Sequence, residues 1–180
     1  MKTKAEKIFK EELDMIEDLD LRDWVIKVFD QLCPDKFWTD PASHSSKHHP
    51  KPCNAKHGLV LHTRYAVYWG LKLLQAFNGD KDAVIAALLL HDIIKTEGIP
   101  GEHGVILANR IRITIGSSSH NQDLVIAGIE SHMGCWTQPQ KYCPTYYNDS
   151  TLQIRYIVHL ADYCASRKAC EWLKNKIKSS

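Results

Sequence analysis

A histidine and an aspartate, His91 and Asp92, stand side by side at the end of an apolar run that covers residues 83–90. A run of this composition predicts a buried helix. Burying an imidazole and a carboxylate at its end is costly unless a partner compensates them, and a divalent cation does so. The pair therefore indicates a metal site, although a His-Asp dipeptide alone also occurs by chance.

Other metal-ligand residue types accompany further apolar segments. His62 lies just before a segment whose apolar spacing suits a largely buried helix, and His132 and Asp162 adjoin the apolar runs 124–129 and 157–161. Helices are rigid, so they can hold such side chains at one point, where a cation would satisfy all of them. We therefore expect four apolar helices to converge on a metal.

The order of these residues resembles the signature of the HD-domain metal-dependent phosphohydrolases, in which a His, a His-Asp pair and a distant Asp lie on helices. Members with two metals have two more histidines between the pair and the last Asp. The order in this chain is His62, His91-Asp92, His103, His132 and Asp162. The resemblance covers roughly residues 37 to 170.

Local motifs add to this resemblance. The segment Gly58–Thr63 is similar to the opening motif of small phage and bacterial HD proteins and of the HD domain of some 3'-5' exoribonucleases. The segment His91–Lys95 matches His-Asp-Ile-Gly-Lys except at Ile94, which stands where the family has Gly. This departure adds bulk near the turn but removes no ligand.

The resemblance implies a role for each residue of the set. His62, His91 and Asp162 would hold a first metal, His103 and His132 a second, and Asp92 would bridge both because a carboxylate has two oxygens. Two such ions activate a shared water for in-line attack on phosphorus. Asp92 and Lys95 are thus the catalytic candidates, with Lys95 holding a substrate phosphate. Without the resemblance, an exposed lysine at a helix end is an equally good interpretation of Lys95.

The cofactor expected from the ligand types is a divalent metal, as one ion or two. Imidazole and carboxylate ligands suit Mn, Fe, Co, Ni or Zn, and so many histidines are less natural for Mg alone. The sequence leaves the choice among these metals open.

Candidate substrate contacts flank the ligands. Ser43, Lys47 and His49 lie in stretches that resemble the Pro-Ala-Ser and Lys-Tyr-His segments before the family's opening motif, and Arg167 follows Asp162 by little more than a turn. These side chains would bind phosphate or sugar oxygens. Aromatic residues of two irregular stretches could stack a nucleobase or anchor the loops to the core: Phe37, Trp38, Trp136, Tyr142, Tyr146 and Tyr147.

Helices are needed to hold the candidate ligands in place, and the hydrophobic pattern of the chain predicts them. No segment shows sustained alternation of period two, so we predict an all-α fold, an HD-domain helical bundle with two long irregular loops near the metal site. A single domain over residues 1–180 would comprise N-terminal amphipathic helices in 1–33, an active-site loop in 34–57 and the metal-bearing core in 58–175. The loop holds four of the seven prolines, and residues 134–149 form the second irregular stretch.

Composition narrows the class of protein. The 180 residues are 44% hydrophobic with a net charge of +2, which fits one globular domain and argues against a long nucleic acid as partner. No run of about 20 apolar residues occurs, so we expect no membrane contact and a cytoplasmic location. Six scattered cysteines do not make a disulfide framework. A homodimer is what the resemblance suggests.

The expected function is hydrolysis of a phosphate ester or anhydride of a nucleotide by a metal-activated water. The similarity of the opening motif to exoribonucleases leaves open a 3'-5' exonuclease acting on short oligonucleotides. A non-catalytic module could bind a nucleotide in the same pocket. A helical protein with a purely structural metal is the remaining alternative, and it would have no open coordination position.

Overall fold

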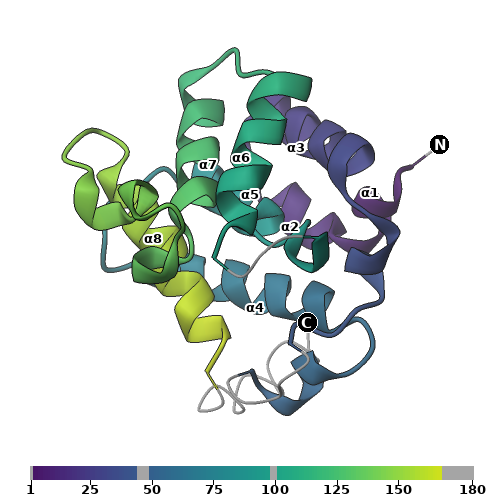
Figure 1. The fold of residues 1–180 in the computed structure, drawn as a ribbon. Helices are drawn as coiled ribbons and strands as arrows, with labels where there is room; N and C mark the ends of the chain where they lie inside the picture. Colours follow the sequence, from purple (N-terminus) through teal and green to yellow (C-terminus); the bar gives the residue numbers. More distant parts are fainter. Residues whose placement is uncertain (1, 44–48, 98–100, 168–180) are drawn as a thin grey trace.

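The computed structural model describes residues 2–43, 49–97 and 101–167, and these form eight α-helices without a β-strand (Figure 1). The all-α prediction is therefore confirmed. The helices are α1 (Lys4–Ile8), α2 (Lys10–Asp14), α3 (Leu19–Leu32), α4 (Gly58–Leu73), α5 (Lys81–Leu90), α6 (His103–Thr114), α7 (His120–Ser131) and α8 (Leu152–Ala165). No helix of the described part is long and apolar enough to cross a membrane.

Helix α5 lies at the centre of the bundle. Each of its residues from Ala83 to Leu90 is fully buried, and α5 packs against α3, α4, α7 and α8. Its first turn is fixed by Asp80, whose side chain accepts a hydrogen bond from the N–H of Ala83 at 2.7 Å. The apolar run thus forms the buried helix that its composition predicts, and the packing holds its C-terminal end deep inside the molecule.

The N-terminal segment, for which the sequence predicted amphipathic helices, forms α1, α2 and α3. Thr3 and Glu6 make a reciprocal capping box at α1, and Asp18 caps α3. Between α1 and α2 the chain turns at Phe9, whose ring is fully buried against Phe29. The amphipathic pattern of the sequence continues almost without a break through this point. The packing of the Phe9 ring against the core therefore separates α1 from α2.

In the residues that the structure describes, the two irregular stretches form only short 3-10 turns. The first holds η1 (Asp35–Trp38) and η2 (Lys51–Asn54), and the second holds η4 (Gly134–Trp136), η5 (Gln140–Tyr142) and η6 (Pro144–Tyr146). A further turn, η3 (Lys95–Glu97), follows α5. The last part of the predicted core, residues 168–175, lies outside the described residues.

A buried ion pair ties α7 to α8. Glu130 and Arg155 are 3% and 4% exposed, and the Nη1 atom of Arg155 lies 3.1 Å from the Oε2 atom of Glu130. The same Nη1 donates to the carbonyl of Ala127, and the guanidinium lies over the ring of Tyr147. Arg112 of α6 reaches the other oxygen of Glu130 at 2.8 Å. Three helices and the second irregular stretch therefore meet at one carboxylate.

Substitution Arg155→Met should lower the free energy of unfolding by about 3–5 kcal/mol, because it leaves a buried carboxylate short of its main partner. Urea denaturation measures the change. Arg110→Met is the matched control, since it removes an exposed Arg–Glu97 pair and should cost less than about 1 kcal/mol. Equal effects of the two substitutions would contradict this account of the network.

Candidate metal centre

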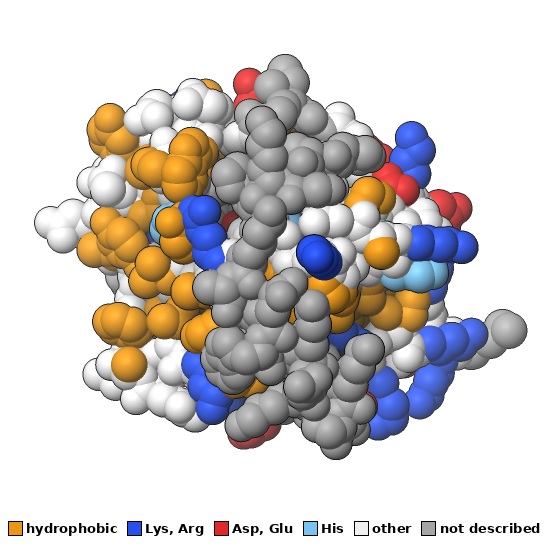
Figure 2. All heavy atoms as spheres, turned by 90° about the horizontal axis from the view of Figure 1, so that it is seen from below, with side chains coloured by type: hydrophobic (Ala, Val, Ile, Leu, Met, Phe, Trp, Pro, Cys, Tyr) orange, Lys and Arg blue, Asp and Glu red, His pale blue; other side chains and the backbone are white. Residues whose placement is uncertain are grey.

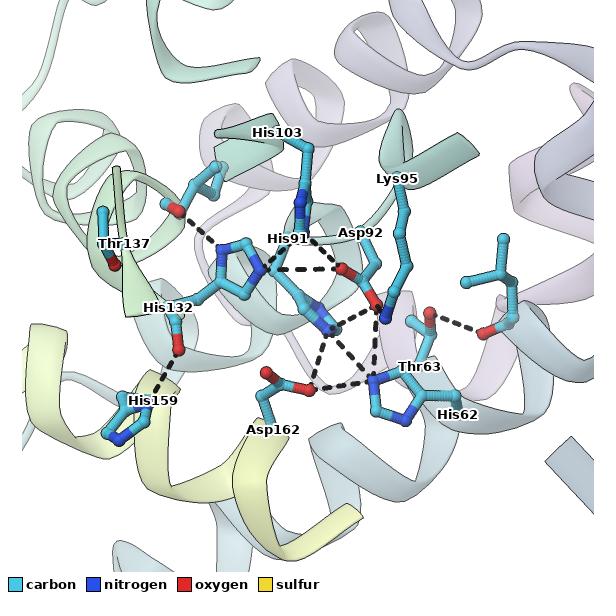
Figure 3. A network of polar contacts seen from close by, with 12 residues as sticks. His62, Thr63, His91, Asp92, Lys95, His103, His132, Thr137, His159 and Asp162 are labelled. Atoms are coloured by element: carbon cyan, nitrogen blue, oxygen red, sulfur yellow. Dashed lines mark hydrogen bonds and ion pairs between the residues drawn. The ribbon is translucent and has the colours of Figure 1, made fainter. Parts of the chain in front are cut away.

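All six predicted ligands meet at one point in the bundle (Figure 3). His62 lies in the second turn of α4, and His91 is the residue at the C-terminal cap of α5, with Asp92 directly after it. The remaining ligands come from the start of α6, the C-terminal cap of α7 and the last turn of α8: His103, His132 and Asp162. The five ligands other than Asp162 are at most 3% exposed.

The first group comprises His62, His91, Asp92 and Asp162, whose ligand atoms lie within 4.8 Å of one another. The Nε2 atom of His62 is 2.9 Å from the Oδ1 atom of Asp162 and 3.4 Å from the Oδ2 atom of Asp92. His91 Nε2 is 3.5 Å from the same Asp92 oxygen. Four donors of the types that bind transition metals thus surround one small volume.

The second group comprises Asp92, His103 and His132. The Nε2 atom of His103 lies 3.0 Å from the Oδ1 atom of Asp92 and 2.9 Å from the Nε2 atom of His132. Asp92 therefore turns one carboxylate oxygen toward each group. This is the arrangement that a bridging ligand between two metals requires.

Helix ends set the orientation of two of the rings. The ring of His91 contacts the carbonyl of Leu88 through Nδ1 at 2.6 Å, and the ring of His132 contacts the carbonyl of Ile129 through Nδ1 at 2.8 Å. These carbonyls belong to the last turns of α5 and α7, where helix carbonyls lack their usual i+4 partner; that of Ile129 also accepts the N–H of His132 at 3.4 Å. A ring that donates from Nδ1 keeps the lone pair of Nε2 for the centre, as metal-bound histidines usually do.

A glycine brings the second pair of rings together. A Cβ atom at Gly104 would lie 2.5 Å from the carbonyl oxygen of Ile129 and 2.7 Å from the His132 ring. Any side chain at this position would force α6 away from α7. The absence of one lets His103, the preceding residue, reach His132.

The charges of the centre are closely balanced. Burial by itself raises the pKa of Asp92, but the charges of Lys95 and His91 outweigh it and hold this pKa well below its ordinary value. Burial likewise raises the pKa of Asp162, and the rings of His62 and His91 reverse the effect. Burial lowers the pKa of His62. Burial also lowers the pKa of His103, whereas at His91 burial is outweighed by the carboxylates of Asp92 and Asp162, which raise the pKa. The centre therefore combines ionised carboxylates with uncharged imidazoles at His62 and His103, and of these three rings a metal would have to displace a proton only from His91.

The donor set fits a divalent metal. The Oδ1 atom of Asp162 is buried without a well-aligned hydrogen bond, although His62 Nε2 lies 2.9 Å away. Two further nitrogens, His103 Nε2 and His132 Nε2, face each other at 2.9 Å. Ligand-type nitrogen and oxygen atoms held this close inside a protein would be stabilised by a cation among them.

Lys95 stands next to the bridging carboxylate. Its Nζ atom lies 2.6 Å from the Oδ2 atom of Asp92, and its side chain is 26% exposed. Helix α5 ends at Leu90, and Lys95 begins the turn η3. The N–H of Lys95 donates to the carbonyl of Asp92 at 3.0 Å, so a single turn of chain brings the two side chains together.

A cavity of about 660 Å³ opens beside the first group and is lined by Lys95 and Asp162. The predicted substrate-binding residues Ser43, His49 and Arg167 also line it, whereas Lys47 lies outside the described residues. His49 is 7% exposed, and burial, with smaller effects from His62 and Lys95, lowers its pKa to about 3. His49 is therefore a neutral hydrogen-bonding group at neutral pH, not a cation.

The aromatic residues singled out in the sequence take different roles. Phe37 and Trp38 are buried against Phe9 and Phe29, so they anchor the first loop. Trp136 lines the cavity. Two further lining residues, His159 and Tyr163, were missed by the sequence analysis. They are four residues apart, on either side of Asp162, and residues at this spacing are neighbours on a helix surface. This spacing is the signal that could have identified them.

The wild-type chain should bind two divalent ions, and His103→Ala should bind one, because it removes a ligand of the second group only. Asp92→Ala should lower the affinity for both. Dialysis against Mn²⁺ or Co²⁺ followed by elemental analysis gives the stoichiometry, and metal at 100 times its dissociation constant should stabilise the fold by about 2.7 kcal/mol. His120→Ala, which changes an exposed histidine of α7, should keep both ions. Two ions retained by His103→Ala would contradict this assignment.

No protein-family model, curated protein or solved structure matches the chain. The chain has an all-helical fold with a buried His/Asp cluster that can hold a metal, and this combination is compatible with an HD domain.

Proposed function

We propose that this protein is a metal-dependent phosphohydrolase of the HD type that cleaves a phosphate ester or anhydride of a nucleotide. One observation carries the proposal: Asp92 directs one oxygen to each of two histidine-containing groups. A carboxylate in this position is suited to a pair of metals, and paired metals are typical of enzymes that cleave phosphate esters.

The ligand types favour Mn, Fe, Co, Ni or Zn over Mg. When bound, such an ion supplies an activated water and neutralises charge on the phosphoryl oxygens. The ligands Asp92 and Asp162 remain ionised in the folded protein, so they require no proton loss before they bind.

The residues of the chain would bind and orient the substrate. Lys95 and Arg167 line the cavity and offer N–H donors to phosphate oxygens. His49 is buried, and its Nδ1 atom has no hydrogen-bond partner within the described part of the chain. It can therefore hydrogen-bond a sugar or phosphate oxygen without adding charge.

Two features favour catalysis on a small substrate. Asp162 lines the cavity, so the first group can be reached by a ligand, unlike a closed structural metal site. The cavity of about 660 Å³ lies within the range of roughly 300–1,000 Å³ that is usual for small-molecule sites. A mononucleotide fits this range better than a long RNA chain does.

Asp92→Ala should lower phosphate release by about 1,000-fold or more, because it removes the ligand shared by both groups. The assay uses nucleoside mono-, di- and triphosphates, cyclic nucleotides and short oligonucleotides with Mn²⁺ or Co²⁺. Asp123→Ala, which changes an exposed aspartate of α7, is the control and should retain wild-type turnover. No release from any substrate by folded, metal-loaded wild type would overturn the proposal and favour a non-catalytic binding module.

Lys95→Met should lower kcat by about 100-fold, because it removes one donor to the charge that develops on the phosphoryl oxygens in the transition state. The metal content of the variant should remain that of the wild type, since lysine is not among the ligands. Lys72→Met, an exposed lysine over the ring of Tyr68, should leave kcat unchanged. An unchanged kcat for Lys95→Met would show that Lys95 only balances the charge of Asp92.

A further inference from the structure

Two chemically different kinds of side chain line the cavity beside the metal centre. Lys95 and Asp162 are charged, whereas Met133, Trp136 and Tyr163 are apolar or aromatic. Hydrophobic side chains also gather on the left of Figure 2, the side on which Figure 1 shows α8. A ligand that contacts both kinds therefore needs an anionic group and an apolar group.

Trp136 and Tyr163 present flat aromatic surface to the cavity. The rings of Trp136 and Tyr163 are parallel to within 5°, with centroids 6.3 Å apart. They are 55% and 39% exposed, whereas Phe37 and Trp38 are buried in the core. Exposed parallel rings that line a cavity are suited to stacking on a planar heterocycle.

The position of Trp136 is fixed by the fold. Gly134 has a φ of +59°, and a Cβ atom there would lie 2.2 Å from the His159 ring, so only glycine lets this turn lie directly against α8. The His159 ring contacts the carbonyl of His132 through Nδ1 at 2.8 Å. The turn that carries Trp136 is therefore attached on both sides to elements that carry metal ligands.

Arg167 adds hydrogen-bond donors beside this aromatic surface. Its guanidinium carbon lies 3.7 Å from the centroid of the Tyr163 ring. Its Nε atom is buried without a hydrogen-bond partner within the described residues. Lys95, by contrast, is already paired with Asp92. Arg167 thus offers donors that a ligand can use.

We propose that Trp136 and Tyr163 bind the base of a nucleotide whose phosphate lies at the metal centre. Asp162 and Tyr163 are adjacent on α8, so the two ends of such a ligand are recognised by neighbouring residues of one helix. This inference rests on the proposed function and adds its substrate selectivity. The protein then prefers nucleotides to sugar phosphates that lack a base.

The test compares AMP, GMP and CMP with ribose 5-phosphate, which has the same phosphate but no base. Dissociation constants are measured by equilibrium dialysis on Mn²⁺-loaded protein, and kcat/KM replaces them for any ligand that is cleaved. Trp136→Leu and Tyr163→Leu should each reduce the preference for nucleotides over ribose 5-phosphate by roughly 10-fold, within the range that base–aromatic stacking contributes.

Tyr156→Leu is the matched control. Tyr156 also lies on α8 and is 38% exposed, nearly the same as Tyr163, but it lines a different groove with Phe77. This variant should keep the wild-type preference, and an equal loss in Tyr156→Leu would overturn the inference. So would a wild type that binds ribose 5-phosphate as well as the nucleotides, or an unchanged preference in both cavity variants. If Asp92→Ala still abolishes phosphate release in those cases, the proposed function stands without the base site.

Discussion

The burial of one negative charge governs the rest of this structure. Asp92 is 1% exposed and its pKa lies well below the ordinary value, so an ionised carboxylate sits in the interior of the bundle. Such a charge costs several kcal/mol unless it is paired. Lys95 on one oxygen and His103 on the other provide the pairing in the protein alone. A divalent cation on each side would provide it more completely, and the helices are arranged so that both sides can receive one.

The sequence could predict His91, Asp92 and His132 as ligands because they lie where an apolar helix ends. The apolar run before His91 forms a buried helix, so the end of that helix and the two residues after it had to be buried as well. The same reasoning holds for His132 at the end of α7. It did not settle the role of Lys95, because a lysine near a helix end is equally well placed in solvent; the 2.6 Å approach of its Nζ atom to Asp92 places it at the centre. Helix termini depend on tertiary packing more than helix interiors do.

The wall of the cavity could not be predicted in the same way. Trp38 and Trp136 both lie in irregular stretches with proline, yet the first is buried against Phe29 and the second lines the cavity. The difference comes from contacts between segments far apart in the chain, such as the approach of Gly134 to His159. Composition indicates that an irregular stretch carries aromatic residues. Only the packing decides which of them reach the site.

The distance between the two metal groups depends on a network outside the centre. Glu130 precedes His132 by two residues on α7, and Arg155 precedes Asp162 by about two helical turns on α8. Their buried ion pair fixes how far α8 can slide along α7, and so fixes a ligand of the first group relative to a ligand of the second. Arg112 extends the same restraint to α6, which carries His103. Since Asp92 can bridge only a narrow range of spacings, this network helps to keep the ligands of α6, α7 and α8 where one carboxylate reaches both groups.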